Sequence, residues 1–359
     1  MTTIAPPETL VRLSRPDDNA ALLDLALACP MEGDIALAIS RGPDFFALNR
    51  LEGSDWRLGV AEVEGRIVGC VMAAARTMYL HGRVQRTLYA GDLKVHPAHR
   101  RRGVADALTE WALGELEDLG GPDTPTLITV LAGNRAMERR ATRYLRFATI
   151  RAFSIPLLWA RSIPSMRVHA AVEADLDEMV SLWHRVAVGR QFAPSFDAGE
   201  LRAWISNAPG LSIDDYRVAR DRNGRIVGFM AWWDQSTFKQ SRVLRYSRRL
   251  AVARAAINGV ATLTHGVKLP SVGEPLRYRT ALHMCVPAER PDVLRAFVRA
   301  SCAELRAQRY AFATIGLDVR DPLCAAMSGL GAQPTDVGAY VLRPMGDLGD
   351  RPLHYEIAL

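Results

Sequence analysis

The sequence predicts an α/β (α+β) protein made of two tandem domains that share one plan. Its 359 residues are enough for about two domains. The run GRIVGCV, which begins at Gly65, returns as GRIVGFM at Gly224. Each copy follows a short apolar strand and a tight polar turn, which is the pattern of a β-hairpin. Such internal similarity indicates two copies of one structural unit.

An amphipathic helix is predicted upstream of each hairpin. The first covers residues 18–29 and the second residues 175–188, and in both the apolar residues recur at helical spacing. The junction between the copies is expected within residues 158–166, where the pattern is interrupted by proline and serine. We therefore predict one domain over residues 1–160 and a second over residues 161–359.

Composition and charge bound the kinds of partner. Hydrophobic residues make up 49% of the chain and the mean hydropathy is near zero, as in soluble globular proteins. The net charge of +6 and the pI of about 9.2 suit an anionic ligand such as a nucleotide phosphate, and suit nucleic acid equally. No apolar stretch reaches the roughly 18 residues of a membrane span, and the first residues lack a signal-peptide pattern. We expect a cytoplasmic location and no membrane partner.

The cysteine pattern bears on metals and disulfides. The five cysteines are odd in number, widely separated and include no Cys-x-x-Cys pair. This pattern argues against a disulfide framework or a zinc site. We expect reduced thiols and no bound metal.

The most informative stretch is a strand, a loop and a helix. Residues 87–95 have the pattern of a strand, residues 96–103 form a polar loop, and a helical apolar face begins at Val104. The first amides of a helix have no intrahelical acceptor and its dipole is positive there, so this junction predicts an anion site. Gly103 leaves room for a pyrophosphate to approach the backbone, and three neighbouring arginines add positive charge.

Here the sequence resembles a known family. The letters VHP from Val95, followed by RRRGVA from Arg100, resemble the signature with which GNAT N-acetyltransferases bind the pyrophosphate of coenzyme A. The resemblance continues through a strand at residues 126–131 into a helix expected to end at residues 144–147, and it covers most of residues 8–160. It implies two tandem GNAT-like domains, each a mixed, mostly antiparallel sheet flanked by helices, with acetyl-CoA as co-substrate.

The resemblance also implies which residues hold the cofactor. The end of the first strand is expected to splay from its neighbour and to pair with the pantetheine amides, while the loop and the helix start hold the pyrophosphate. The implied cofactor-binding residues are Leu93, Lys94, Val95, Arg100, Arg101, Arg102, Gly103, Val104, Ala105 and Asn134.

Two residues are candidates for proton transfer when an amine attacks the thioester directly. Tyr144 resembles the family tyrosine that protonates the leaving thiolate, and core packing is its alternative role. Asp92 lies on the cofactor strand and is a candidate base, directly or through water, or else a strand-edge carboxylate. The predicted reaction is acetyl transfer from acetyl-CoA to a primary amine of an unidentified small molecule or peptide.

The second copy lacks the anion site. After its matching strand, the loop before the next helix has no glycine. Glu289 and Asp292 would repel a pyrophosphate there, and Pro291 removes an amide donor. We predict a degenerate GNAT-like domain that supports the first and helps to wall its acceptor pocket.

Two questions stay open in the sequence. Within residues 237–273, six cations lie in an expected helical stretch, which is either a site for an acidic acceptor or nucleic acid, or a solvated helix face: Lys239, Arg242, Arg245, Arg248, Arg249 and Arg254. No basic pattern interleaved with aromatic residues supports nucleic acid as a partner. A non-catalytic acyl-CoA-binding or sensory protein would share the phosphate loop, so it remains the alternative to an enzyme.

Overall fold

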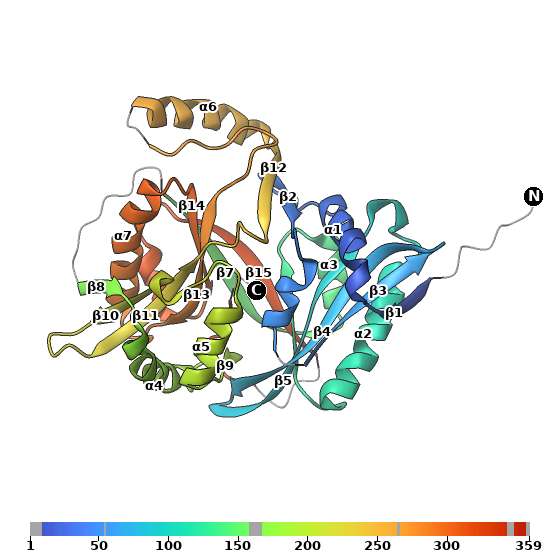
Figure 1. Cartoon of the computed structure of the whole chain (residues 1–359), viewed down its shortest axis with the longest axis horizontal. Helices are drawn as coiled ribbons and strands as arrows, with labels where there is room; N and C mark the ends of the chain where they lie inside the picture. Colours follow the sequence, from blue (N-terminus) through green and yellow to red (C-terminus); the bar gives the residue numbers. More distant parts are fainter. Residues whose placement is uncertain (1–8, 54, 158–166, 264–265, 343–347, 357–359) are drawn as a thin grey trace, which may run out of the picture.

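The structure is a computed structural model, which describes residues 9–53, 55–157, 167–263, 266–342 and 348–356. The predicted junction at 158–166 lies outside the described residues. The rest of the chain forms two halves joined by one continuous, mixed sheet with helices on its faces (Figure 1). The predicted α/β (α+β) class is confirmed.

The main sheet runs without a break from one half to the other. Its strands, in spatial order, are β1 (Leu10–Leu13), β3 (Asp55–Val63), β4 (Arg66–Leu80), β5 (Arg83–Val95), β6 (Thr126–Leu131), β15 (Gln333–Leu342), β7 (Leu145–Pro156), β14 (Phe312–Asp318), β13 (Tyr278–Cys285), β11 (Ile226–Trp233), β10 (Tyr216–Arg220) and β8 (Arg167–Ala170). The short β9 (Ala193–Pro194) pairs with β4.

The two halves exchange their last strands. β15 ends the C-terminal half, yet it pairs antiparallel with β6 of the N-terminal half. β7 ends the N-terminal half, yet it pairs antiparallel with β14 of the C-terminal half. Because β7 and β15 also pair with each other, the exchange joins the two sheets edge to edge. Each half therefore depends on backbone hydrogen bonds from the other to complete its sheet.

Both predicted hairpins are present. β3 and β4 are joined at Glu64 and Gly65, which have φ of 51° and 73°, as the tight turn requires. β10 and β11 form the second hairpin. The second glycine of each repeat, Gly69 or Gly228, lies under a helix. A Cβ at Gly69 would lie 2.8 Å from Leu108 of the covering helix, and one at Gly228 would lie 2.9 Å from Val293. Glycine lets a helix approach the sheet in each half.

Helices other than α6 cover the two faces of the sheet, and in each half a helix precedes the hairpin as the sequence predicts. The helices are α1 (Asn19–Ala28), α2 (Val104–Gly120), α3 (Arg135–Ala141), α4 (Leu176–Ala187), α5 (Ala198–Asn207), α6 (Arg248–Leu263) and α7 (Pro291–Ala307). Short 3-10 turns lie at Pro16–Asp18, Phe45–Ala47, Asn49–Leu51, Pro97–His99, Glu173–Asp175, Ile213–Asp215 and Pro322–Met327. In the N-terminal half, α1 packs on one face and α2 on the other.

Two expectations about local structure are wrong. The helix expected to end at residues 144–147 ends at Ala141, and β7 begins at Leu145, because β7 is drawn into pairing with β15. The basic stretch 237–273 is not one helix. It begins with β12 (Gln240–Tyr246), which pairs with β2 (Ile35–Ser40) in a separate two-stranded sheet, and only then forms α6.

Candidate active site

β5 and β6 of the N-terminal half part after a short paired stretch, and we call the unpaired region between them the gap. The strands pair in parallel only from Leu88 opposite Thr126 to Ala90 opposite Ile128. Over residues 91–95, which include the predicted cofactor-binding residues of this strand, β5 pairs with β4 but no longer with β6. Backbone groups on that edge of β5 therefore face the gap, which is the splayed arrangement that the family resemblance implies.

The start of α2 closes one end of this gap. Gly103 is the N-cap residue with φ of 82°, a left-handed conformation that favours glycine, and a Cβ there would meet open space. The amides of Asp106 and Ala107 donate to the carbonyl of Gly103 at 2.9 and 3.0 Å. The preceding amides, of Val104 and Ala105, have no helical acceptor, so they are left for an anion.

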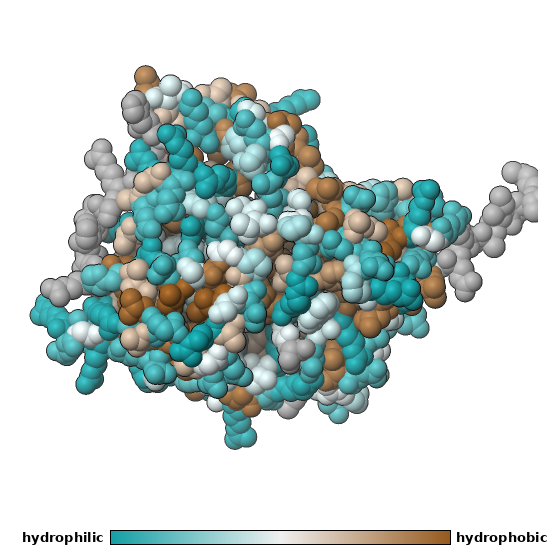
Figure 2. All heavy atoms as spheres, in the orientation of Figure 1, coloured by the Kyte–Doolittle hydropathy of each residue, from teal (hydrophilic) through white to brown (hydrophobic). Residues whose placement is uncertain are grey.

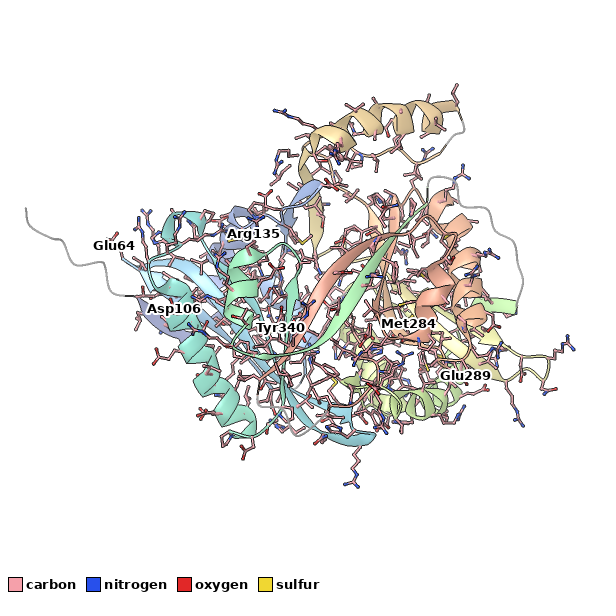
Figure 3. The ribbon with its side chains drawn as sticks, turned by 180° about the vertical axis from the view of Figure 1, so that it is seen from behind. Glu64, Asp106, Arg135, Met284, Glu289 and Tyr340 are labelled. Atoms are coloured by element: carbon pink, nitrogen blue, oxygen red, sulfur yellow. The ribbon has the colours of Figure 1, made fainter. Side chains whose placement is uncertain are left out.

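Positive side chains surround the helix start. Arg100, Arg101 and Arg102 are exposed, and none of them forms an ion pair with another described residue. The acidic residue in the first turn of α2, Asp106, is neutralised by Arg140 of α3 at 2.6 Å. Figure 3 shows Asp106 and Arg135, at the starts of α2 and α3, in the same half of the molecule. The field at this helix start is therefore positive.

Asn134 and Tyr144 flank the far side of the gap, after β6. Asn134 is the N-cap of α3, and its side-chain oxygen accepts from the amide of Met137 at 3.3 Å. Tyr144 lies between α3 and β7, where it packs against Val130 and Tyr340. This cluster is on the α3 side of the sheet, so Tyr144 can act on the gap only from that face. The packing that would serve as its alternative role is present.

Asp92 lies on the opposite, α1 face, at a β-bulge. Two residues of β5, Asp92 and Leu93, stand opposite one residue of β4. Asp92 has φ of 55°, a conformation that aspartate tolerates better than most residues. Its carboxylate forms ion pairs with Arg41 and Lys94 and accepts from Asn49 at 3.4 Å. The bulge thus aims a carboxylate into a small network of cations.

This network controls the charge of Asp92. Burial by itself would raise the pKa of Asp92, but the positive charges of Arg41 and Lys94 overcome it and hold the pKa well below its usual range. Arg41 is buried and also donates to the side chain of Asn49 at 3.0 Å. Asp92 is therefore a stable carboxylate, and a carboxylate this well stabilised accepts a proton poorly.

The closed end of the gap is filled by large polar side chains. Tyr89 of β5 and Tyr355 of the C-terminal segment both lie against Thr129 of β6, and burial raises the pKa of each phenol. The guanidinium of Arg76 stands 4.4 Å over the ring of Tyr89, and it pairs with Glu52. Hydrocarbon inserted here would strip hydrogen bonds from these groups, which is costly.

The C-terminal half contributes a lysine to the surroundings of Asp92. Lys239, just before β12, lies within electrostatic range of Asp92 and its two cations. Burial, with repulsion from Arg41, lowers the pKa of Lys239 to about 8. A cavity of about 110 Å³ lies beside it and is lined also by Ser241 and Tyr278. The site is therefore built from both halves.

The corresponding place in the C-terminal half has the same backbone but different chemistry. His283 and Met284 of β13 form a bulge opposite one residue of β11, and His283 has φ of 47°. β13 and β14 pair in parallel only as far as Thr280. At the start of α7, Pro291 occupies the first turn and Asp292 pairs with Arg290 at 2.8 Å. The proline and the carboxylate that the sequence places at this helix start are thus in its first turn, and whether this half binds a cofactor stays a prediction.

The chain itself occupies the space that opens between β13 and β14. The amide of Leu353 donates to Asp318 of β14 at 2.8 Å, and the carboxylate of Glu356 accepts from the amide of His283 at 3.1 Å. The His283 ring lies 4.7 Å from that of Trp204 and is hydrogen-bonded to Tyr216 at 2.6 Å. A pantetheine could enter this half only by displacing the C-terminal segment.

Sequence reasoning missed the residues that meet Asp92 from elsewhere in the chain. Arg41 and Asn49 belong to the connection after β2, which carries no recognisable motif. Lys239 lies in the basic stretch that we singled out, but the expectation of one helix hid its position. No motif in the sequence marks Lys239 as a neighbour of Asp92.

Two searches of the described residues bear on other classes of site. No three His, Cys, Asp or Glu side chains within them are placed to share a metal ion. None of their helices combines the length and the apolar character that crossing a membrane requires.

Part of the sequence that contains this site matches a known family model. The family model for the acetyltransferase (GNAT) domain matches residues 35–122, which include β5, the arginine loop and α2. No curated protein matches the sequence. The predicted GNAT resemblance is thus confirmed for residues 35–122.

Solved structures extend the likeness to the whole chain. N-myristoyltransferase from Saccharomyces cerevisiae with bound myristoyl-CoA has a TM-score of 0.65 at 11% identity, over 96% of this chain and 79% of that one. A GCN5-related N-acetyltransferase from Sphaerobacter thermophilus has a TM-score of 0.56 at 16% identity, over 94% of this chain and 96% of that one. At such identities the likeness shows the fold alone, which this chain shares with these two transferases.

Proposed function

We propose that this protein is an N-acyltransferase that moves an acetyl group from acetyl-CoA to a primary amine, with its one working site in the N-terminal half. The observation that carries the proposal is the gap between β5 and β6, which opens beside the unpaired amides and arginines at the start of α2. A pyrophosphate at Gly103 and pantetheine along residues 91–95 would point the thioester toward the closed end of the gap.

The closed end favours a short acyl group. Arg76, Tyr89 and Tyr355 fill it with buried polar atoms, and a long hydrocarbon chain would have to displace them. The yeast N-myristoyltransferase structure is described as holding myristoyl-CoA. A comparison of acyl-CoA lengths is therefore the direct test of this part of the proposal.

The two faces of the sheet divide the chemistry in this proposal. The amine approaches from the α1 face, where Asp92 and its cations orient it or an ordered water, and its nitrogen attacks the thioester carbonyl. As the C–S bond breaks, Tyr144 on the α3 face gives its phenolic proton to the thiolate. Because Arg41 and Lys94 hold the pKa of Asp92 low, its carboxylate is a weak base, and the amine must lose its proton mainly to solvent. The rate should therefore follow the pKa of the amine itself.

The test is turnover by the full-length protein on a panel of amines. Release of free thiol from acetyl-CoA, faster than from longer acyl-CoAs and dependent on an added amine, would support the proposal. A kcat/KM that rises with pH in step with each amine's own pKa would support the proton route. Tight CoA binding with no thiol release on any amine would instead favour the non-catalytic acyl-CoA-binding alternative.

A further inference from the structure

One part of the C-terminal half has no counterpart in the N-terminal half. β4 and β5 are joined by a two-residue turn at His81 and Gly82, whereas β11 and β13 are joined by residues 234–277. We call residues 240–276, which contain β12, α6 and the segment returning to β13, the arm. In Figure 1, α6 stands clear of the main body and is joined to it through β12. The GNAT-like fold is complete without this helix.

The arm carries a net positive charge. Residues 240–276 contain six Lys or Arg residues and one carboxylate, Glu274. Arg245 is compensated by Glu32 at 2.7 Å, but both side chains are largely exposed. Arg248, Arg249 and Lys268 are also exposed. A surface of this charge attracts an anionic partner.

The outward face of α6 is apolar. Leu250, Ile257 and Ala261 face the arm and pack in its small core. Val252 and Leu263 lie on the opposite side, 76% and 84% exposed, and Val272 of the returning segment is 63% exposed. These are the most exposed large apolar side chains of the described residues. Figure 2 shows pale and brown residues among the teal ones at the upper edge of the molecule, over α6.

We propose that the arm docks on an anionic lipid surface, with α6 lying in the plane of the interface. Val252 and Leu263 would enter the headgroup layer, and the exposed cations would meet the lipid phosphates. A projecting, convex helix reaches a flat surface before the rest of the molecule does. The expectation of no membrane partner rested on the lack of a spanning segment, and peripheral contact needs only one such helix face.

Other occupants fit these observations less well. A second copy would bring two arms of the same charge together, which electrostatic repulsion opposes. Nucleic acid would be attracted by the cations but would leave the apolar centre of the face unused. A lipid surface satisfies both features at once, and this proposal does not depend on the enzymatic activity.

The experiment is co-sedimentation of the full-length protein with phosphatidylcholine vesicles, with and without phosphatidylglycerol. We expect binding to the anionic vesicles only, and weaker binding as salt rises. Val252→Glu with Leu263→Glu should weaken it at least about tenfold. Arg248→Ser with Arg249→Ser should weaken it about 30-fold, since each cation near an anionic surface contributes comparably. Val84→Glu, which changes another exposed valine far from the arm, should bind as the wild type does.

Three outcomes would overturn the proposal. The first is wild-type protein that stays in the supernatant with both vesicles, and the second is equal binding by the α6 variants that keep the wild-type circular dichroism. The third is a salt-strengthened dimer in light scattering that Val252→Glu with Leu263→Glu abolishes, because that result would assign the face to a second copy. Nucleic acid that binds the protein in a gel shift and displaces it from the vesicles would likewise replace lipid as the occupant.

Discussion

The two halves share a β-bulge at the matching strand, but the side chains around the bulge differ. In each, a strand bulges at a residue with positive φ, Asp92 in β5 and His283 in β13, and then parts from its parallel neighbour. The first bulge presents a charged carboxylate beside an open gap. The second presents a histidine that is 4% exposed, in a gap filled by residues 353–356. The fold alone therefore does not make a site, and the side chains at the bulge and the helix start decide it.

Gly103→Glu should produce the largest effect, because it places a carboxylate at the start of α2, as the second half has at the start of α7. The wild-type chain should bind one CoA, and the variant should bind it at least about 10³-fold more weakly, since like-charge juxtaposition costs several kcal/mol. Titration calorimetry measures both. Gly224→Glu is the matched control, because Gly224 has the same φ of 82° and equally open surroundings. Two equivalents per chain, or unchanged affinity in a folded Gly103→Glu, would contradict the assignment.

Local signals account for what the sequence predicted correctly. The hairpins, α2 and the loop before it follow from turn residues, apolar periodicity and Gly103, all of which act within a few residues. The strand exchange could not be found in this way. β7 mixes apolar and polar residues, and β15 ends in a continuous apolar run. Neither pattern says in which half the strand pairs, and only the completed tertiary structure selects the partner.

The candidate site divides along the same line. The candidate residues that the motif carries, such as Gly103 and Lys94, could be predicted because they are close together in the sequence. Arg41, Lys239 and Tyr355 come from three distant segments, and the chain brings them to Asp92 and Tyr89 only through β2, β12 and the C-terminal segment. Their side-chain types are common, so no spacing rule marks them in one sequence.

Tyr144→Phe tests whether the N-terminal gap carries out chemistry that the second half does not. If the phenol protonates the thiolate, kcat should fall about 10²-fold with CoA affinity little changed. Tyr340→Phe is the control, since Tyr340 belongs to the same packed cluster but lies on the exchanged strand β15. Equal kcat values for the two variants would leave Tyr144 with a packing role only.

Asp92→Asn should weaken the first bulge itself. It removes the charge that compensates buried Arg41 and also Lys94. Losing one partner of a buried ion pair costs several kcal/mol, and because Asp92 is about one-fifth exposed we expect a loss of about 2 to 3 kcal/mol in unfolding free energy. Urea unfolding measures it. Restored stability in Asp92→Asn combined with Arg41→Met would identify the unpaired cation as the cause, and no change in either variant would refute the network.

The smallest expected effect is a pH dependence that belongs to the second bulge alone. Burial lowers the pKa of His283 to about 4, whereas the unfolded chain titrates this histidine near its ordinary value. The unfolded state therefore takes up the proton first, and stability is full above pH 6.5 and is lost as the pH falls toward 4. Between pH 7 and 5 the unfolding free energy should drop by about 2 kcal/mol from this group.

His283→Gln should remove that part of the slope, and urea unfolding of both proteins at the two pH values isolates it from the other histidines. The neighbouring Glu356 does not add to the slope in this window. Burial alone would raise its pKa, but His354 and His283 hold the pKa below its ordinary value, so it stays charged down to pH 5. Asp92 stays charged throughout as well, because its cations hold its pKa low. An equal slope in the variant and the wild type would mean that His283 has the same pKa in the folded and the unfolded protein, and that the C-terminal segment does not shield it from water.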